Sequence, residues 1–327
     1  MENNRSAFFD NAKFILIFLV VLGHVISPYR GNEEWLGAIY HFIYIFHMPA
    51  FILLAGYFSR NFHKKKYYVK IVTHLLFPYV LLQTVYTFYY NNLYLNTDFS
   101  LQYFTPRWAM WFLLSMIAWK LLLPLYTKIR PAYAIILSII IGILAGFIEV
   151  PDRFLSLDRT FYFFPFFLIG YYLFNTSIFE EVKKKKWLAP AIGALIISFT
   201  VVYSVLHNIV GASILYGTYT SNSVSDIVIQ LAMYSVSLLI TFSFFTLIPR
   251  KRRFYTAIGQ RSFYVYILHG FIIKWFFETN FGQSIQSILD YIILFLVSIL
   301  VTYITGNKLI VTIVSKPFHI IKKSMPL

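Results

Sequence analysis

Long apolar runs are the feature that most constrains what this chain can fold into. About ten runs approach the roughly 20 residues that a helix needs to cross a bilayer. They lie at 12–29, 36–59, 71–92, 108–126, 131–149, 161–179, 188–206, 227–248, 262–277 and 289–307. Only 13% of the residues are charged, against about 25% in a soluble domain. We therefore predict an all-α, polytopic integral membrane protein.

The basic residues provide a separate test of this map, because cytoplasmic loops hold the excess of Lys and Arg. If the N-terminus is cytoplasmic, most of the 28 basic residues fall in inner segments. The outer segments then contain most of the acids and only a few arginines, namely Arg30, Arg107, Arg153 and Arg159. The pattern predicts about ten transmembrane helices with both termini in the cytoplasm.

Several functional classes are excluded by composition. The net charge is +15, but the basic residues lie in short clusters between apolar runs and not on one solvated face, so we expect no nucleic-acid partner. The absence of cysteine excludes disulfides, thiolate metal sites and cysteine nucleophiles. We find no H-E-x-x-H pair and no Gly-rich phosphate loop, and expect no metal. No separate soluble domain is evident, so residues 1–327 are expected to form a single membrane-embedded domain.

Histidines inside apolar runs are the first functional candidates, since an ionisable side chain at membrane depth is costly. His24, His47 and His269 lie well inside three runs. Lys13 precedes His24 on the same helix face, about 16 Å away along the axis. This pair could hold an anionic donor at one end and deprotonate a hydroxyl at the other. Alternatively, His24 makes a buried hydrogen bond between helices and Lys13 anchors the topology.

Other polar or aromatic positions have two interpretations each. Pro49 follows His47 closely and frees a backbone carbonyl, which fits either a cavity wall or a packing kink. Arg159 lies on the predicted outer side, where it could bind an anionic substrate or pair with Asp158. Trp111 belongs to an aromatic run that fits an interfacial belt or a surface on which a sugar stacks.

Several motifs together resemble the acyltransferase-3 family of membrane acyltransferases. They begin with Asp10-Asn11-Ala12-Lys13, Val20-Val21-Leu22-Gly23-His24 and Phe46-His47-Met48-Pro49-Ala50-Phe51 through Ala55-Gly56-Tyr57-Phe58. They continue with Ile258-Gly259-Gln260-Arg261-Ser262 and Tyr266-Ile267-Leu268-His269-Gly270. Trp111-Phe112-Leu113 and the segment from Arg159 to Gly170 further resemble the fucose-4-O-acetylase-like branch.

The resemblance implies transfer of an acyl group, usually acetyl from cytoplasmic acetyl-CoA, to a glycan hydroxyl at or beyond the outer face. The family's first-helix motif is an arginine, ten intervening residues and a histidine that is essential for transfer. The spacing is kept here, which makes His24 the catalytic candidate, but Lys13 replaces the arginine. The positive charge remains while a bidentate contact is lost.

We therefore expect an O-acetyltransferase of a cell-surface polysaccharide or its lipid-linked precursor, in the bacterial plasma membrane. His24 removes the hydroxyl proton or first relays the acetyl group. His47 and His269 orient the reactants or stabilise the oxyanion, and Arg159 and Trp111 are substrate-binding candidates. The CoA phosphates are expected on a basic rim made of Lys13, Arg250, Lys251, Arg252 and Arg253.

Acetyl-CoA is expected as a donor substrate and not as a permanently bound cofactor. The expected partners are acetyl-CoA, the glycan acceptor, the lipid bilayer and polysaccharide-assembly proteins. Two other functions remain open. The first is a lipid-linked sugar flippase or other transporter, which would also need many helices and a basic inner rim. The second is a structural partner in a glycan-export complex. Turnover of acetyl-CoA distinguishes them, because transport leaves the thioester intact.

Overall fold

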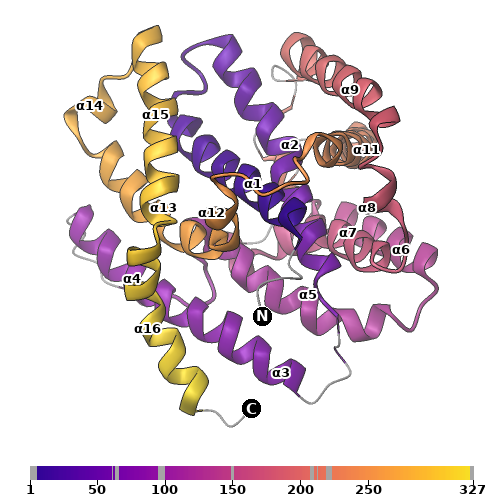
Figure 1. Cartoon of the computed structure of the whole chain (residues 1–327), viewed down its shortest axis with the longest axis horizontal. Coiled ribbons are helices and arrows are strands. Elements are labelled where there is room, and N and C mark those ends of the chain that lie inside the picture. Colours follow the sequence, from indigo (N-terminus) through magenta and orange to yellow (C-terminus); the bar gives the residue numbers. More distant parts are fainter. Residues whose placement is uncertain are drawn as a thin grey trace. The chain divides into compact units, whose positions relative to one another are not determined.

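The computed structural model describes residues 6–60, 62, 66–94, 100–148, 151–206, 210–211, 213–218 and 223–324. All regular elements in these residues are helical (Figure 1). The chain divides into two compact units. Unit 1 comprises Met1–Phe51, Asn175–Leu215 and Val224–Val311, and unit 2 comprises Ile52–Phe174, Tyr216–Ser223 and Thr312–Leu327. The unit boundaries fall inside α2 (Glu34–Tyr57), η7 (Ile214–Tyr216) and α16 (Lys308–Ser324).

Unit 1 contains the start of α2, the helices that precede it and the helices from α8 to α15. These are α1 (Ala7–Ile26), η1 (Ser27–Tyr29), α8 (Ile178–Glu181), η5 (Lys185–Trp187), α9 (Leu188–Val201), η6 (Val202–Leu206), α11 (Val224–Leu247), α12 (Thr256–Gln260), α13 (Ser262–Phe277), α14 (Asn280–Gln283) and α15 (Ile288–Thr305). Unit 2 contains the end of α2 with α3 (Lys66–Ile71), η2 (Val72–Leu76), α4 (Phe77–Leu93), η3 (Trp108–Met110), α5 (Trp111–Tyr126), α6 (Pro131–Ala145), η4 (Pro151–Ser156) and α7 (Leu157–Leu173).

The prediction of an all-helical protein with membrane-spanning helices is confirmed. In the described part of the chain, seven helices are long and apolar enough to cross a membrane: Ala7–Tyr29, Glu34–Tyr57, Lys66–Leu93, Trp108–Tyr126, Lys185–Leu206, Val224–Leu247 and Ile288–Thr305. Two further apolar helices, Pro131–Ala145 and Ser262–Phe277, are shorter. Helix α7 overlaps the remaining predicted run, but it has 17 residues and carries Asp158 and Arg159 near its start. The count of ten and the cytoplasmic termini therefore stay predictions, as does the single domain.

Helix α1 is the centre of packing in unit 1. It contacts α12, α13 and α15, and Figure 1 shows these elements alongside it. Leu16, Val21 and Val25 lie on its buried side with no more than 1% exposure. Burial of large aliphatic side chains on several neighbours fixes the rotation of α1 about its own axis. That rotation determines where the polar side chains of α1 point.

Pro49 leaves a gap in the backbone hydrogen bonds of α2, and a side chain of α11 fills it. Proline has no N–H, so the carbonyl four residues earlier, on Ile45, loses its helical donor. The Ser237 hydroxyl donates to that carbonyl at 2.7 Å, and Ser237 is fully buried. The freed carbonyl predicted from the sequence is thus used by a neighbouring side chain.

Two glycines bring helices together in unit 2. A Cβ atom on Gly56 of α2 would collide with the backbone carbonyl of Phe167, and one on Gly170 of α7 would collide with that of Leu53. The two backbones cross in direct contact, which only residues without a side chain permit. Helix α7 also packs along α6 and against α5, where Trp119 is fully buried and donates to the Thr160 carbonyl at 2.7 Å.

Helix α16 was not predicted. The sequence indicated only a basic inner segment after the last run, yet Lys308–Ser324 forms a helix. Its 17 residues are fewer than the roughly 20 that a membrane-spanning helix needs. Leu309 and Ile313 are highly exposed on it. An amphipathic helix of this kind is typical of one that lies in the membrane interface.

Candidate active site

The N-terminal half of α1 carries a buried ion pair. The ammonium of Lys13 lies 2.6 Å from Asp10 Oδ1, and the side chains are 20% and 2% exposed. Gln260 of α12 donates to the other carboxylate oxygen of Asp10 at 3.0 Å. Because a buried carboxylate is costly unless it is paired and hydrogen-bonded, these two contacts hold Lys13 and α12 in place together.

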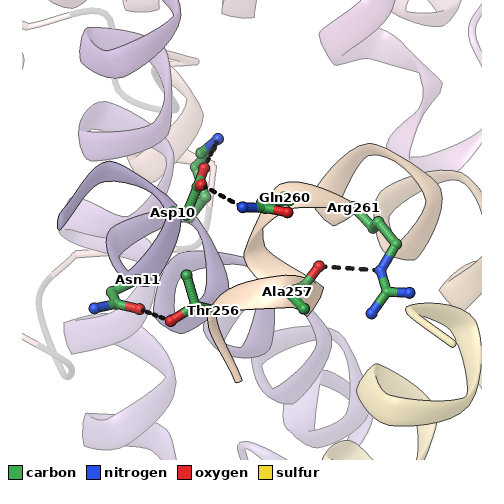
Figure 2. A network of polar contacts seen from close by, with 7 residues as sticks. Asp10, Asn11, Thr256, Ala257, Gln260 and Arg261 are labelled. Carbon is green, nitrogen blue, oxygen red and sulfur yellow. Dashed lines mark hydrogen bonds and ion pairs between the residues drawn. The ribbon is translucent and has the colours of Figure 1, made fainter. Parts of the chain in front are cut away.

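Asn11 connects α1 to the basic segment that follows α11. Its amide donates to the carbonyls of Pro249 at 2.8 Å and Lys251 at 2.9 Å. Its carbonyl oxygen accepts from the Thr256 hydroxyl at 2.6 Å, and Thr256 in turn accepts the N–H of Arg253 at 2.7 Å. Figure 2 shows Asn11 facing Thr256 and Asp10 facing Gln260. Asn11 is completely buried, so these bonds fix the course of the basic segment.

The five residues of the predicted basic rim all belong to unit 1. The side chains of Arg250, Lys251, Arg252 and Arg253 are all exposed, and Asn11, which holds their backbone, is two residues from Lys13. Gly259 allows this arrangement, since a Cβ there would collide with the Asp10 carbonyl. The late family motif thus packs directly on the first one. Lys13 differs from the four others because its charge is already paired with Asp10.

The histidines of α1 and α13 meet at the other end of α1. The rings of His24 and His269 lie 5.4 Å apart between centroids, at 33° to each other. The Tyr44 hydroxyl of α2 lies 3.3 Å from His24 Nδ1. His47, one turn beyond Tyr44 on α2, is 4.9 Å from the Tyr44 ring. The convergence of all three candidate histidines in unit 1 had no basis in the sequence, where their helices are far apart.

Backbone bonds define the tautomers of the two buried histidines. His47 Nδ1 lies 2.6 Å from the Ile43 carbonyl, and His269 Nδ1 lies 3.0 Å from the Val265 carbonyl. A carbonyl only accepts, so each Nδ1 carries a proton and each neutral ring has Nε2 as an acceptor. His47 and His269 are 3% and 0% exposed, whereas His24 is half-buried. His24 is therefore the one that a substrate reaches most directly.

Tyr44 is a site residue that the sequence analysis missed. Its hydroxyl faces His24 Nδ1, so a general base at His24 acts through Nε2 in this arrangement. Tyr44 lies three residues before His47 on one helix face, which was the available signal. Tyrosine is so frequent in this chain, with 26 copies, that this spacing alone did not single it out. Among the described residues, no group of three or more His, Asp or Glu side chains could hold a metal ion.

Arg159 and Trp111 form a separate cluster in unit 2. The Arg159 guanidinium lies 5.2 Å from the Trp111 ring centroid and 4.3 Å from that of Tyr216. Arg159 is 9% exposed and Trp111 is 6% exposed. The backbone three residues before each of them is strained: φ is 46° at Trp108, before Trp111, and 46° at Ser156, before Arg159. Left-handed backbone at bulky or non-glycine residues is frequent at functional sites.

Comparison with known proteins agrees with the motifs and the geometry. A family model for an acyltransferase domain matches residues 6–306. The chain is 30% identical over 199 residues to nodulation protein NolL of Sinorhizobium fredii, covering 55% of this chain and 52% of that protein. It is 47% identical over 60 residues to nodulation protein NolL of Mesorhizobium japonicum, covering 17% of this chain and 16% of that protein.

The chain thus spans about half the length of the first of these relatives. No solved structure matches it. The family model, in contrast, extends over both units and nearly the whole chain, including every helix described above except α16. It also includes all the candidate residues on α1, α2 and α13. We conclude that this membrane protein belongs to the acyltransferase-3 family of membrane acyltransferases.

Proposed function

We propose that the protein is a membrane O-acetyltransferase. It transfers acetyl from cytoplasmic acetyl-CoA to a hydroxyl of a cell-surface polysaccharide or its lipid-linked precursor, in the bacterial plasma membrane. The observation that carries this proposal is the position of His24. It is half-buried, faces Tyr44 and His269, and shares α1 with Lys13, which adjoins the exposed basic rim. A proton acceptor on α1 and a basic segment whose backbone is held by Asn11 of the same helix thus both belong to unit 1.

The acetyl transfer needs one proton acceptor. In the general-base route, His24 Nε2 takes the proton of the acceptor hydroxyl as the oxygen attacks the thioester carbon. The C–S bond then breaks, and the imidazolium returns the proton to the CoA thiolate. In the relay route, Nε2 attacks the thioester carbon, the C–S bond breaks and CoA leaves as the thiolate. The acceptor hydroxyl then attacks the acetyl carbon, the bond from that carbon to the ring nitrogen breaks, and the hydroxyl proton ends on the CoA thiolate. Both routes are compatible with Tyr44 at Nδ1.

The tautomers favour one of the two roles considered for the flanking histidines. A neutral ring with its Nδ1 proton on a backbone carbonyl offers an acceptor at Nε2 and no donor. Such a ring accepts a hydrogen bond from a substrate hydroxyl, but it cannot donate one to an oxyanion. We therefore assign His47 and His269 to orienting the reactants.

The basic rim is proposed to hold the phosphates of the donor. Replacing Arg250, Lys251, Arg252 and Arg253 together should raise the KM for acetyl-CoA more than it lowers kcat, because these contacts persist from ground state to transition state. Lys13→Arg should keep the activity, since the charge that pairs with Asp10 remains. An unchanged donor KM in the inserted quadruple variant would assign the cluster to topology alone.

Arg159 and Trp111 are proposed to contribute to acceptor binding. The support is a buried guanidinium between two aromatic rings, next to strained backbone. Such rings stack on sugars, and the cation suits an anionic glycan. Arg159→Lys keeps the charge but loses the planar stacking. We expect it to raise the acceptor KM without changing the release of CoA in the absence of acceptor.

The decisive experiment measures thiol release from acetyl-CoA by the purified protein. Wild type should release CoA when a glycan acceptor is present, whereas a flippase would leave the thioester intact.

His24→Ala should lose about 10²-fold or more of this activity per folded molecule and still bind CoA. His41→Ala is the control: His41 bonds to the carbonyls of Gly37 and Val210, so its loss should cost stability but not specific activity. Near-wild-type specific activity in His24→Ala would remove it from the mechanism.

A further inference from the structure

Unit 2 contains a basic cavity that the proposed reaction does not use. Its volume is about 550 Å³, and it is lined by residues that directly follow α2, by α3 and η2, and by α5. Its basic lining residues are Arg60, Lys66, Lys70, His74 and Lys120. From the sequence, most of these residues lie in a basic stretch that is predicted to be on the inner side of the membrane. The structure instead brings these cations around one space.

Three of the basic residues that line the cavity lie on one face of the continuous helix formed by α3 and η2. Lys66, Lys70 and His74 recur every four residues, so they lie on one face of the continuous helix. Residues Val72–Leu76 form a π-helical turn, a rare conformation that is frequent at functional sites. The Thr73 hydroxyl donates to the Val69 carbonyl at 2.9 Å and lies 2.7 Å from His74 Nδ1. It therefore accepts the Nδ1 proton, which fixes the orientation of the His74 ring.

Lys120 reaches the cavity from α5. It is half-buried, and its ammonium donates to the Ser59 hydroxyl at 3.0 Å and lies 5.6 Å from the Tyr67 ring centroid. The Tyr67 hydroxyl in turn donates to the Lys120 carbonyl at 2.9 Å. These contacts position the ammonium precisely enough for binding, but they are with neutral groups. Its charge is therefore not compensated by them.

Within the described residues, no carboxylate forms an ion pair with the lysines and the arginine of this cluster. The sequence from Arg60 to His74 contains no Asp or Glu. In the part of the chain that the structure describes, Arg60, Lys66, Lys70 and Lys120 are in no ion pair. Cations gathered around one space repel each other and raise the local concentration of anions. An anionic ligand in the cavity would relieve this repulsion.

We propose that this cavity binds the phosphate groups of an anionic ligand. Lysine ammonium groups and a forked guanidinium are the usual protein contacts of phosphate. The volume is within the range of roughly 300–1,000 Å³ that is typical of small-molecule sites, so it accommodates more than a bare phosphate. The positive-inside pattern places the cavity at the cytoplasmic rim. The phosphate then comes either from a soluble nucleotide or from a phospholipid of the inner leaflet.

The test uses the full-length protein in nanodiscs and needs no acyl transfer. One arm titrates adenosine 3′,5′-bisphosphate, and the other compares thermal stabilisation by phosphatidylglycerol and phosphatidylcholine. Lys66→Gln/Lys70→Gln changes exposed side chains only, so it should fold normally. Lys120→Met removes the cation from the other wall. Lys128→Gln, a lysine near the inner end of α5 that does not line this cavity, is the matched control.

Both cavity variants should lose affinity about tenfold or more for the nucleotide, or lose the extra stabilisation by phosphatidylglycerol, while Lys128→Gln binds like wild type. Loss in the first arm identifies a nucleotide phosphate, and loss in the second identifies a lipid headgroup. The proposal is overturned if both variants behave like wild type in both arms. It is also overturned if only the Arg250 to Arg253 variant loses affinity. Neither result affects the outcome of the thiol-release assay, so the proposed acyl transfer is tested separately.

Discussion

The Tyr44 hydroxyl lies 3.3 Å from His24 Nδ1 and can donate to it or accept from it, depending on the tautomer. In the tautomer with the proton on Nδ1, this N–H donates to the Tyr44 oxygen and Nε2 is the basic nitrogen. We expect Tyr44→Phe to lower kcat roughly tenfold, the value of one hydrogen bond to a group that becomes charged. The pH profile of kcat should also shift, because the hydroxyl no longer stabilises one protonation state of the imidazole.

Tyr40→Phe provides the matched control for this change. Tyr40 stacks on Tyr44 with 4.0 Å between ring centroids and is equally buried, but the described bond to His24 comes from Tyr44. Its pH profile should match that of wild type. Equal effects of the two substitutions would show that only packing of the stacked rings matters.

The candidate histidines could be predicted from the sequence, whereas their supporting residues could not. A histidine is costly in an apolar run, so His24, His47 and His269 each attract notice. Asn11 and Tyr44 acquire their roles only through contacts with distant segments, such as the Pro249 carbonyl that Asn11 binds. The spacing of residues within one helix does not predict a contact with a distant segment. The basic cavity was missed for a related reason, because Lys120 joins Lys66 and Lys70 only through packing of α5 on η2.

At the scale of single elements, the bond between Ser237 and Ile45 couples α11 to the proline kink of α2. Ser237→Ala should destabilise the folded protein by about 0.6 to 1.7 kcal/mol, the range measured for hydrogen bonds between membrane helices. In the background of Pro49→Ala, residue 49 regains an N–H that can bond to Ile45, so Ser237→Ala should cost less. The measurement is a double-mutant cycle of unfolding free energies in lipid or detergent. Strict additivity would mean that Ser237 does not compensate for the proline.

The glycine crossing in unit 2 makes a second prediction at this scale. Gly170→Ala should destabilise the protein by about 1–3 kcal/mol, because the added methyl group meets the Leu53 backbone and neither helix can yield locally. Gly193→Ala on α9 is the control, since nothing lies within 4 Å of its added Cβ. Thermal unfolding of both variants in nanodiscs provides the comparison. Because Gly→Ala raises helix propensity, Gly193→Ala should be neutral or slightly stabilising, and a similar loss in both variants would show that the crossing is not the cause.

Hydropathy located the elements well, but it did not define their ends or their irregularities. Each predicted run overlaps a helix because about 20 apolar residues in a bilayer must satisfy their backbone internally. The π-helical turns η2 and η6 lie within apolar runs and leave no trace in hydropathy. Helix α16 was missed because its lysines interrupt the apolar run while preserving a helical periodicity. A search for spans does not detect an amphipathic helix.

At the scale of the whole molecule, charge sets the orientation in the membrane. The family model extends over both units. The segments predicted to be inside hold most of the 28 basic residues, and those predicted to be outside hold most of the 13 acids. Because the bias alternates from loop to loop, one wrongly assigned span would invert every later segment. The segment between α7 and α8 and the segment between α13 and α15 therefore test both the orientation and the count.

Single cysteines provide this test without background, because the natural chain has none. Ser177 and Gln283 are both exposed, and they lie in segments predicted to be inside and outside respectively. In intact cells, a membrane-impermeant maleimide should label Gln283→Cys and should label Ser177→Cys only after permeabilisation. Reversal of both results would invert the protein and place the basic rim on the outer face, away from cytoplasmic acetyl-CoA. Labelling of both from outside would mean an even number of crossings between them, whereas the three predicted runs between these positions require an odd number. That result would contradict the alternation of charge and with it the predicted path of the chain from α8 to α13.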